Sequence, residues 1–166
     1  PWVKLVLQIA AAVVAIRHGV VIRILTNPGD ASAEAIALGA LSVPVTLLWI
    51  VGMTNALNLI DGLDGLAAGV CGIGCASMLA VSLFLPQATE ISVLVAALGG
   101  ACLGFLPFNI NPAKIFMGDS GSLLLGYVLS TASVLGLFKM YTLVAFAVPV
   151  LTLALPLTDT VFAVVR

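Results

Sequence analysis

Asn55-Ala-Leu-Asn58-Leu-Ile-Asp61-Gly-Leu-Asp64-Gly65 is the polar segment around which the predicted fold is arranged. Its two amides and two carboxylates follow one another every three residues, between two long apolar runs. Side chains three residues apart lie about 60° apart around an α-helix, so the first three polar groups share a face and the fourth does not. Gly62 and Gly65 allow the backbone to leave helical geometry. We therefore expect a helix end and a tight turn that bring these groups together.

The composition of the chain places it in a membrane. Of its 166 residues 62% are hydrophobic and only 8% are charged, with a mean hydropathy of +1.27. Soluble domains carry about 25% charged residues. We expect an all-α polytopic membrane protein in which residues 1–166 form a single transmembrane domain. The net charge of −1, without a basic tract, argues against nucleic acid as a partner.

The apolar runs predict about six transmembrane helices, because about 20 apolar residues cross the hydrocarbon core. Residues 20–25 alternate around Arg23 and could form one strand of a small hairpin. The predicted spans are residues 2–16, 36–54, 66–85, 91–106, 123–138 and 143–165.

A second polar segment follows the fourth predicted span: Pro107-Phe-Asn109-Ile-Asn111-Pro-Ala-Lys114-Ile-Phe116-Met-Gly118-Asp119-Ser-Gly-Ser122. Its two prolines are expected to prevent a continuous helix. Asp119 is expected just before a helix start, where a carboxylate caps exposed amides.

Six antiparallel spans bring both polar segments to the same membrane face. The distribution of basic residues does not say which face this is. On the face of the polar segments lie Lys4, Lys114 and Arg166, and on the other face lie Arg17, Arg23 and Lys139.

The chemistry of the shared face is that of hard oxygen ligands. Carboxylates and amides without His or Cys suit Mg²⁺, with Mn²⁺ as an alternative. Such an ion at a membrane surface indicates phosphoryl transfer, where it neutralises charge on the transferring group. The competing interpretation, that the acidic residues are solvated loop residues capping helices, stays open at this point. The residues gathered there are Asp61, Asp64, Asp119, Asn55, Asn58, Asn109, Asn111 and Lys114.

Residues 55–69 and 111–122 resemble the signatures of the polyprenyl-phosphate N-acetylhexosamine-1-phosphate transferases. The resemblance is greatest to the branch that uses UDP-GlcNAc, because the phospho-MurNAc-pentapeptide branch usually has Thr where Ile60 stands. It implies Mg²⁺-dependent transfer of a sugar-1-phosphate, here GlcNAc-1-phosphate, from a UDP-sugar to polyprenyl (undecaprenyl) phosphate, releasing UMP. This reaction would be the first membrane step of a cell-envelope polysaccharide, a lipopolysaccharide or a teichoic acid. The resemblance also implies a multi-pass protein of the cell membrane whose active-site loops face the cytoplasm.

The resemblance also assigns roles to residues of the two segments. Asp119 is the expected Mg²⁺ ligand, with Asn58 as a second. Asp61 and Asp64 match acidic positions that line the nucleotide-sugar pocket, and with Asp119 they are the candidate catalytic residues. Phe116 is expected to stack on uracil. Further candidates for substrate binding are Asn55, Asn58, Asp64, Asn109 and, through a phosphate contact, Lys114.

Two features of the family are missing from this sequence. Members carry an Asp-Asp motif before the first of these spans and a His-rich loop after the last. We therefore expect residues 1–166 to be part of a longer enzyme and to be inactive alone. A secondary transporter, whose broken helices also present polar groups near glycines, is the main alternative. The number of chains is open, and a homodimer is possible.

Overall fold

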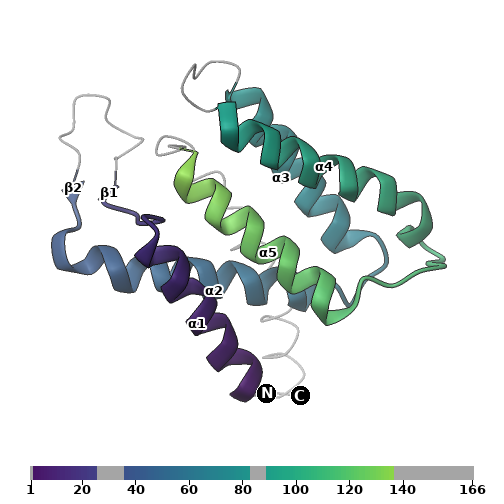
Figure 1. The fold of residues 1–166 in the computed structure, drawn as a ribbon. Helices are drawn as coiled ribbons and strands as arrows, with labels where there is room; N and C mark the ends of the chain where they lie inside the picture. The colour runs from purple at the N-terminus through teal and green to yellow at the C-terminus, as the bar shows by residue number, and fades with distance from the viewer. Residues whose placement is uncertain (1, 26–35, 83–88, 137–166) are drawn as a thin grey trace, which may run out of the picture.

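The computed structural model describes residues 2–25, 36–82 and 89–136. Helices occur at each of the first five predicted spans (Figure 1), whereas the sixth, residues 143–165, lies outside the described residues. The helices are α1 (Trp2–Arg17), α2 (Ser42–Ile60), α3 (Leu66–Ser82), α4 (Thr89–Asn109) and α5 (Gly118–Leu135).

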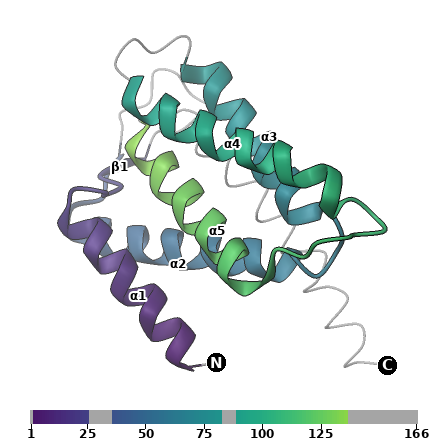
Figure 2. The same cartoon turned by 45° about the vertical axis from the view of Figure 1, so that its right-hand side comes forward.

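The helices pack in two groups that share α5. Helices α3 and α4 lie side by side, and α2 packs on α5 and on α1 (Figures 1 and 2). Helices α2 and α5 are antiparallel, because Asn58 contacts Ser122 while Trp49 contacts Ser133. The turn after α2 and the loop before α5 therefore lie at the same end of the molecule.

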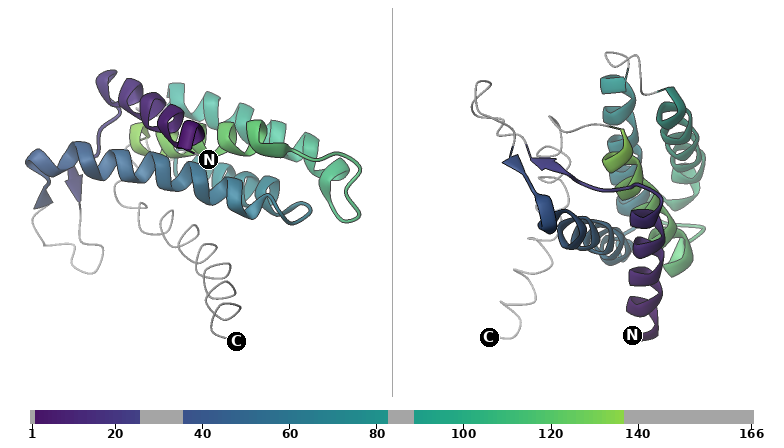
Figure 3. Two further views of the ribbon diagram at one scale, coloured as in Figure 1. Left: turned by 90° about the horizontal axis from the view of Figure 1, so that it is seen from below. Right: turned by 60° about the vertical axis from the view of Figure 1, so that its left-hand side comes forward.

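A short β-ladder lies at the start of α2, far from that end (Figure 3). Strand β1 (Ile24–Leu25) pairs antiparallel with β2 (Ile36–Ala37), which agrees with the strand predicted within residues 20–25. The prediction that the second helix begins at Ile36 was wrong. Leu38 N–H donates to the Arg23 carbonyl and so extends the pairing by one residue, and Gly39, with a φ of +51°, turns the chain away from the strand. A 3₁₀ turn, Gly39–Leu41, then leads into α2.

The second polar segment also departs from the prediction at both ends. Helix α4 runs through Pro107 to Asn109, so this proline does not end it. Proline removes one helical hydrogen bond, a small loss so close to the end of the helix. Helix α5 begins at Gly118, whose φ is +68°, so Asp119 lies in its first turn rather than before it. Met117, at the N-cap position, makes no capping hydrogen bond with its side chain, and the Asp119 carboxylate bonds to residues of other helices.

Among the described residues, two helical segments are long and apolar enough to cross a membrane. They are Gly39–Ile60, with 22 residues, and Glu90–Asn109, with 20. Within an 18-residue apolar stretch of the second segment only 17% is buried inside the protein, which is unlike the core helix of a soluble protein. Its outward side chains include Val93 and Leu103, which are 66% and 67% exposed. Six spans are thus not confirmed.

The approach of α5 to α2 is closest at Gly126. A Cβ atom added there would lie 2.6 Å from Thr54 Cα and 3.1 Å from the Met53 carbonyl oxygen, both backbone atoms. Real Cβ atoms do not come so close to backbone, so the two helices would have to separate. Glycine at this position therefore sets the distance between α2 and α5.

We predict that Gly126→Ala lowers the stability of the folded protein by about 1–3 kcal/mol, the usual range for overpacking a core. The loss is measured as a lower midpoint of thermal unfolding in detergent. Gly100→Ala is the matched control, because a Cβ there has no atom within 4 Å and the change should leave the midpoint unchanged or raised. Equal midpoints for the two variants would contradict the prediction.

Candidate active site

The two polar segments of the sequence contact each other. Asp64, in the turn after α2, accepts hydrogen bonds at its Oδ2 from the Asn111 side chain and from the Ala113 backbone N–H, both 3.1 Å long. These bonds hold the loop between α4 and α5 against the turn between α2 and α3. The expectation that both segments meet at one end of the helices is confirmed.

The buried side chain of Asn109 links the loop between α4 and α5 to the turn between α2 and α3. Its side chain is 4% exposed, accepts a hydrogen bond from Gly65 N–H at 3.1 Å and donates one to the Ile115 carbonyl at 3.0 Å. Gly65 has a φ of +76°, and a Cβ there would lie 3.5 Å from Ile110 Cα. A glycine is required at this position, because the left-handed backbone is strained for other residues.

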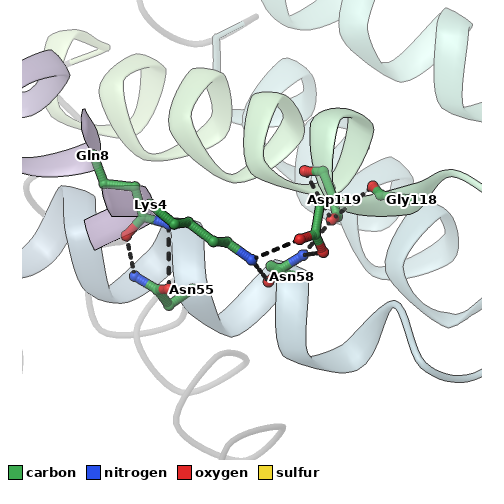
Figure 4. Close-up of polar contacts among 7 residues, drawn as sticks. Lys4, Gln8, Asn55, Asn58, Gly118 and Asp119 are labelled. Atoms are coloured by element: carbon green, nitrogen blue, oxygen red, sulfur yellow. Dashed lines mark hydrogen bonds and ion pairs between the residues drawn. The ribbon is translucent and has the colours of Figure 1, made fainter. Parts of the chain in front are cut away.

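A polar cluster forms where α1, α2 and α5 meet (Figure 4). Asn58 Nδ2 donates to Asp119 Oδ1 at 2.9 Å and to Ser122 Oγ at 2.8 Å. Lys4 Nζ lies 3.2 Å from Asp119 Oδ2 and also donates to Asn58 Oδ1. Three helices thus contribute an amide, a carboxylate and an ammonium group to one point.

A second carboxylate lies next to this cluster. Asp61 directly follows α2. Partial burial and the charge of Asp119 raise its pKa, against the effect of a hydrogen bond from the Gly118 backbone. Asp119 precedes the apolar part of α5, which begins at Leu123. The hydrogen bond from Asn58 lowers the pKa of Asp119, and Lys4 lowers it further. Asp119 is thus held as an anion, with a second acidic group nearby.

The donor set of this cluster fits a hard divalent cation. Asp119, Asp61 and the Asn58 carbonyl offer oxygens, which Mg²⁺ prefers, and the positive Lys4 ammonium group bonds to two of these oxygens in the structure. Within residues 2–25, 36–82 and 89–136 there is no group of three or more His, Cys, Asp or Glu side chains arranged for a metal. Mg²⁺ does not require one, because it is commonly bound by one or two carboxylates together with water and substrate phosphates.

The remaining predicted residues lie on the surface or in helix contacts. Phe116 is 73% exposed, and Lys114 is exposed in the same loop, so both side chains are accessible to a ligand. Asn55 lies on α2 one turn before Asn58, and its amide contacts Gln8 and the Val51 carbonyl.

Sequence reasoning did not predict the roles of Lys4, Gln8 and Ser122. Lys4 and Gln8 are the polar residues of an otherwise apolar predicted span. Their spacing of four residues places them on one face of a helix. That spacing was the available signal, since polar groups on one helix face inside a membrane usually meet a partner.

A sequence model described as glycosyl transferase family 4 matches residues 1–137. The chain belongs to this family. Membership, together with the apolar helices, places the protein in a membrane. The residues of the polar cluster and of the Asn109 contacts all lie within the matched range.

Curated relatives in the family are named as transferases. The chain is 43% identical over 164 residues to a probable undecaprenyl-phosphate N-acetylglucosaminyl 1-phosphate transferase of Bacillus subtilis, covering 99% of this chain and 45% of the relative. It is 52% identical over 97 residues to a phospho-N-acetylmuramoyl-pentapeptide-transferase of Chlamydia trachomatis, covering 57% and 29%. The corresponding Rubrobacter xylanophilus transferase is 42% identical over 131 residues, covering 76% and 39%. The chain thus spans less than half the length of these relatives. None of these names supports the transporter alternative.

We predict that Asn109→Leu loosens the loop between α4 and α5, because it removes the partners of the Gly65 N–H and the Ile115 carbonyl. The local loss should be about 1–3 kcal/mol, the cost of leaving polar groups unpaired. Limited proteolysis of the folded protein measures it as faster cleavage in the loop. Asn111→Ala is the control, since that exposed amide contacts only the surface carboxylate of Asp64, and a smaller effect is expected. Unchanged cleavage of the Asn109 variant would show that this side chain does not fasten the loop.

Proposed function

We propose that the protein transfers N-acetylglucosamine-1-phosphate from UDP-GlcNAc to undecaprenyl phosphate, releasing UMP, with Mg²⁺ as cofactor. The observation that carries the proposal is the cluster of Asn58, Asp119 and Lys4. In it, three helices bring side-chain oxygens and an ammonium group together at one end of the bundle. The name of the Bacillus subtilis relative, which aligns with 99% of this chain, supports the same reaction.

The preference for GlcNAc over a MurNAc-pentapeptide donor rests on the extent of the match to relatives and on the family resemblance of the sequence. The match to the N-acetylglucosaminyl transferase extends over 164 residues, whereas the matches to the two pentapeptide transferases extend over 97 and 131. Ile60 also occupies a position where the pentapeptide branch usually has Thr. This residue is the last of α2 and directly precedes Asp61.

In the proposed reaction an oxygen of the lipid phosphate attacks the phosphorus that carries the sugar. The new P–O bond joins lipid phosphate and sugar phosphate, and the P–O bond to UMP breaks. Asp119 and Asn58 would hold Mg²⁺, which supplies neutralisation of charge on the phosphates. The Lys4 ammonium group bonds to Asn58 and Asp119 in the structure, so with Mg²⁺ bound there it would be displaced from these oxygens and lie beside the site, within reach of a phosphate oxygen. Asp61 adds negative charge beside the cation.

The loop between α4 and α5 is proposed to hold the nucleotide. Phe116 presents an exposed aromatic ring on which uracil stacks, and Lys114 offers a charge to a phosphate. Asp64 and Asn109 fix the shape of this loop through their hydrogen bonds. In the proposed function these two side chains position the loop that binds the nucleotide.

The proposal includes a multi-pass arrangement of six transmembrane helices with both polar segments facing the cytoplasm, where UDP-sugars are made. The product would start a lipopolysaccharide or a teichoic acid. The family match covers residues 1–137. Because the chain spans less than half the length of its relatives, the activity is proposed for the complete protein.

We predict that membranes containing the complete protein transfer label from radiolabelled UDP-GlcNAc to undecaprenyl phosphate only when Mg²⁺ is present. Asp119→Ala should lower the rate at least about 100-fold, because the anion that holds the cation is lost. Glu90→Ala is the matched control, since this exposed acid lies at the opposite end of α4, and full activity is expected. Transfer by Asp119→Ala at the wild-type rate would refute the assignment of the metal ligand.

The donor is tested in the same assay. Labelled UDP-MurNAc-pentapeptide should give no transfer, and a reversal of this preference would move the protein to the other branch. Accumulation of a substrate in sealed vesicles, without any labelled lipid, would instead favour a transporter.

We predict that Phe116→Ala raises the KM for UDP-GlcNAc about tenfold, because stacking on a base contributes about 1–3 kcal/mol. Phe116→Tyr should keep the wild-type KM, since it retains the ring. The neighbouring Ile115→Ala, an exposed apolar side chain in the same loop, is the control. A KM that rises equally for the Phe116 and Ile115 alanine variants would exclude a specific stacking role.

A further inference from the structure

A reciprocal pair of amides joins α1 to α2 one turn away from the polar cluster. Asn55 Nδ2 donates to Gln8 Oε1 at 2.7 Å, and Gln8 Nε2 donates to Asn55 Oδ1 at 3.3 Å (Figure 4). The second hydrogen of the Asn55 amide is also used, by the Val51 carbonyl at 2.8 Å. Both donors of Asn55 are thus engaged within the protein.

This pair and the cluster form one row of polar contacts between two antiparallel helices, α1 and α2. On α1, Gln8 follows Lys4 by four residues, and on α2, Asn55 precedes Asn58 by three. Residues at these spacings lie on the same helix face. Lys4 contacts Asn58, and Gln8 contacts Asn55, so each of the two polar contacts joins one side chain of α1 to one side chain of α2.

We propose that the Gln8–Asn55 pair is a positioning device that sets the register of α1 against α2 and thereby places the Lys4 ammonium group at Asp119. The inference rests on the proposed function. It gives Gln8 and Asn55 a positioning role in which they contact neither the proposed Mg²⁺ site nor the substrate.

The physical reason is the apolar surroundings of α1. Its other side chains between Val3 and Ile16 are apolar, and several face outward, among them Val6, Leu7 and Val14, which are 55–65% exposed. Apolar contacts can form again in a shifted register, whereas a single polar residue at a helix interface specifies one register. An amide pair permits only one register, since a shift by one residue leaves both polar groups without a partner.

Lys4 makes this register important for the site. It lies in the first turn of α1 and reaches Asp119 with a long, flexible side chain. A change in the register of α1 moves the ammonium group along the helix axis by about 1.5 Å for each residue of shift. Displacements of about 1 Å can cost about 100-fold in rate when they misplace a reacting group.

The test is a double-mutant cycle in the transferase assay, with Gln8→Met, Lys4→Met and the double variant in the complete protein. Gln8→Met keeps the length of the side chain and removes its polar groups. We expect it to lower kcat about tenfold, the lower range for partners that orient a site residue, with the KM for UDP-GlcNAc changed less than twofold. In the Lys4→Met background it should cause no further loss, because it acts through Lys4. Full additivity of the two losses would overturn the proposal.

A swapped pair provides the rescue. Gln8→Asn combined with Asn55→Gln keeps the total length of the two side chains and restores the reciprocal hydrogen bonds. The swap should recover most of the lost kcat, while either change alone should not. Ser77→Ala is the control for polar substitutions in a helix, since this hydroxyl contacts the carbonyl of Ile73 in its own helix, and wild-type kcat is expected.

A measurement without turnover separates this inference from the proposed function. Lys4→Cys and Asn58→Cys, in a background without other cysteines, should be joined by a short bismaleimide, and Gln8→Met should lower the yield several-fold. If the wild type transfers no sugar and the yield still depends on Gln8, the proposed function fails and the register assignment stands. A yield that is independent of Gln8 overturns the register assignment.

Discussion

The close approach of α5 to α2 is the constraint on which the rest of the structure depends. Gly126 allows the backbones to come together beside Thr54, and one turn away Asn58 bonds to Ser122 and Asp119. The hydrogen bonds alone would not draw two apolar helices together, since interhelical polar contacts in membranes contribute only about 0.6–1.7 kcal/mol each. Packing at Gly126 sets the distance between α2 and α5, and this distance allows Asn58 to bond to Asp119 and Ser122.

Much of the fold follows from the sequence by short-range rules. The three-residue spacing of amides and carboxylates, followed by Gly62 and Gly65, predicted a helix end and a turn, and α2 ends at Ile60. Antiparallel alternation of the apolar runs predicted that the two polar segments meet, and the bonds of Asp64 confirm it. Both inferences use only the geometry of neighbouring residues and the thickness of a membrane.

The departures occur where contacts distant in the sequence override local preference. Residues 36–39 look like the start of an apolar helix, but pairing with β1 holds Ile36 and Ala37 in a ladder. Asp119 has the pattern of a helix cap, yet its partners Asn58 and Lys4 lie 61 and 115 residues away. A pattern along one helix does not specify which face of another helix it meets, so Lys4 could be predicted near the site end but not at Asp119. The sixth predicted span lies outside the described residues, and the cation and the sugar remain proposals.

The separation of Lys4 and Asp119 along the chain has a consequence for how the protein is made. The two residues are 115 positions apart, and Asn58 lies between them. At about 5–20 residues per second, translation needs roughly 6–23 s to reach Asp119 after Lys4 has been added. During that interval the nascent chain contains the Lys4 ammonium group without the Asp119 carboxylate that balances its charge in the folded protein. The first two helices can therefore pair through their amides, but the charge of Lys4 has no carboxylate at Asp119 to balance it until the ribosome has supplied α5.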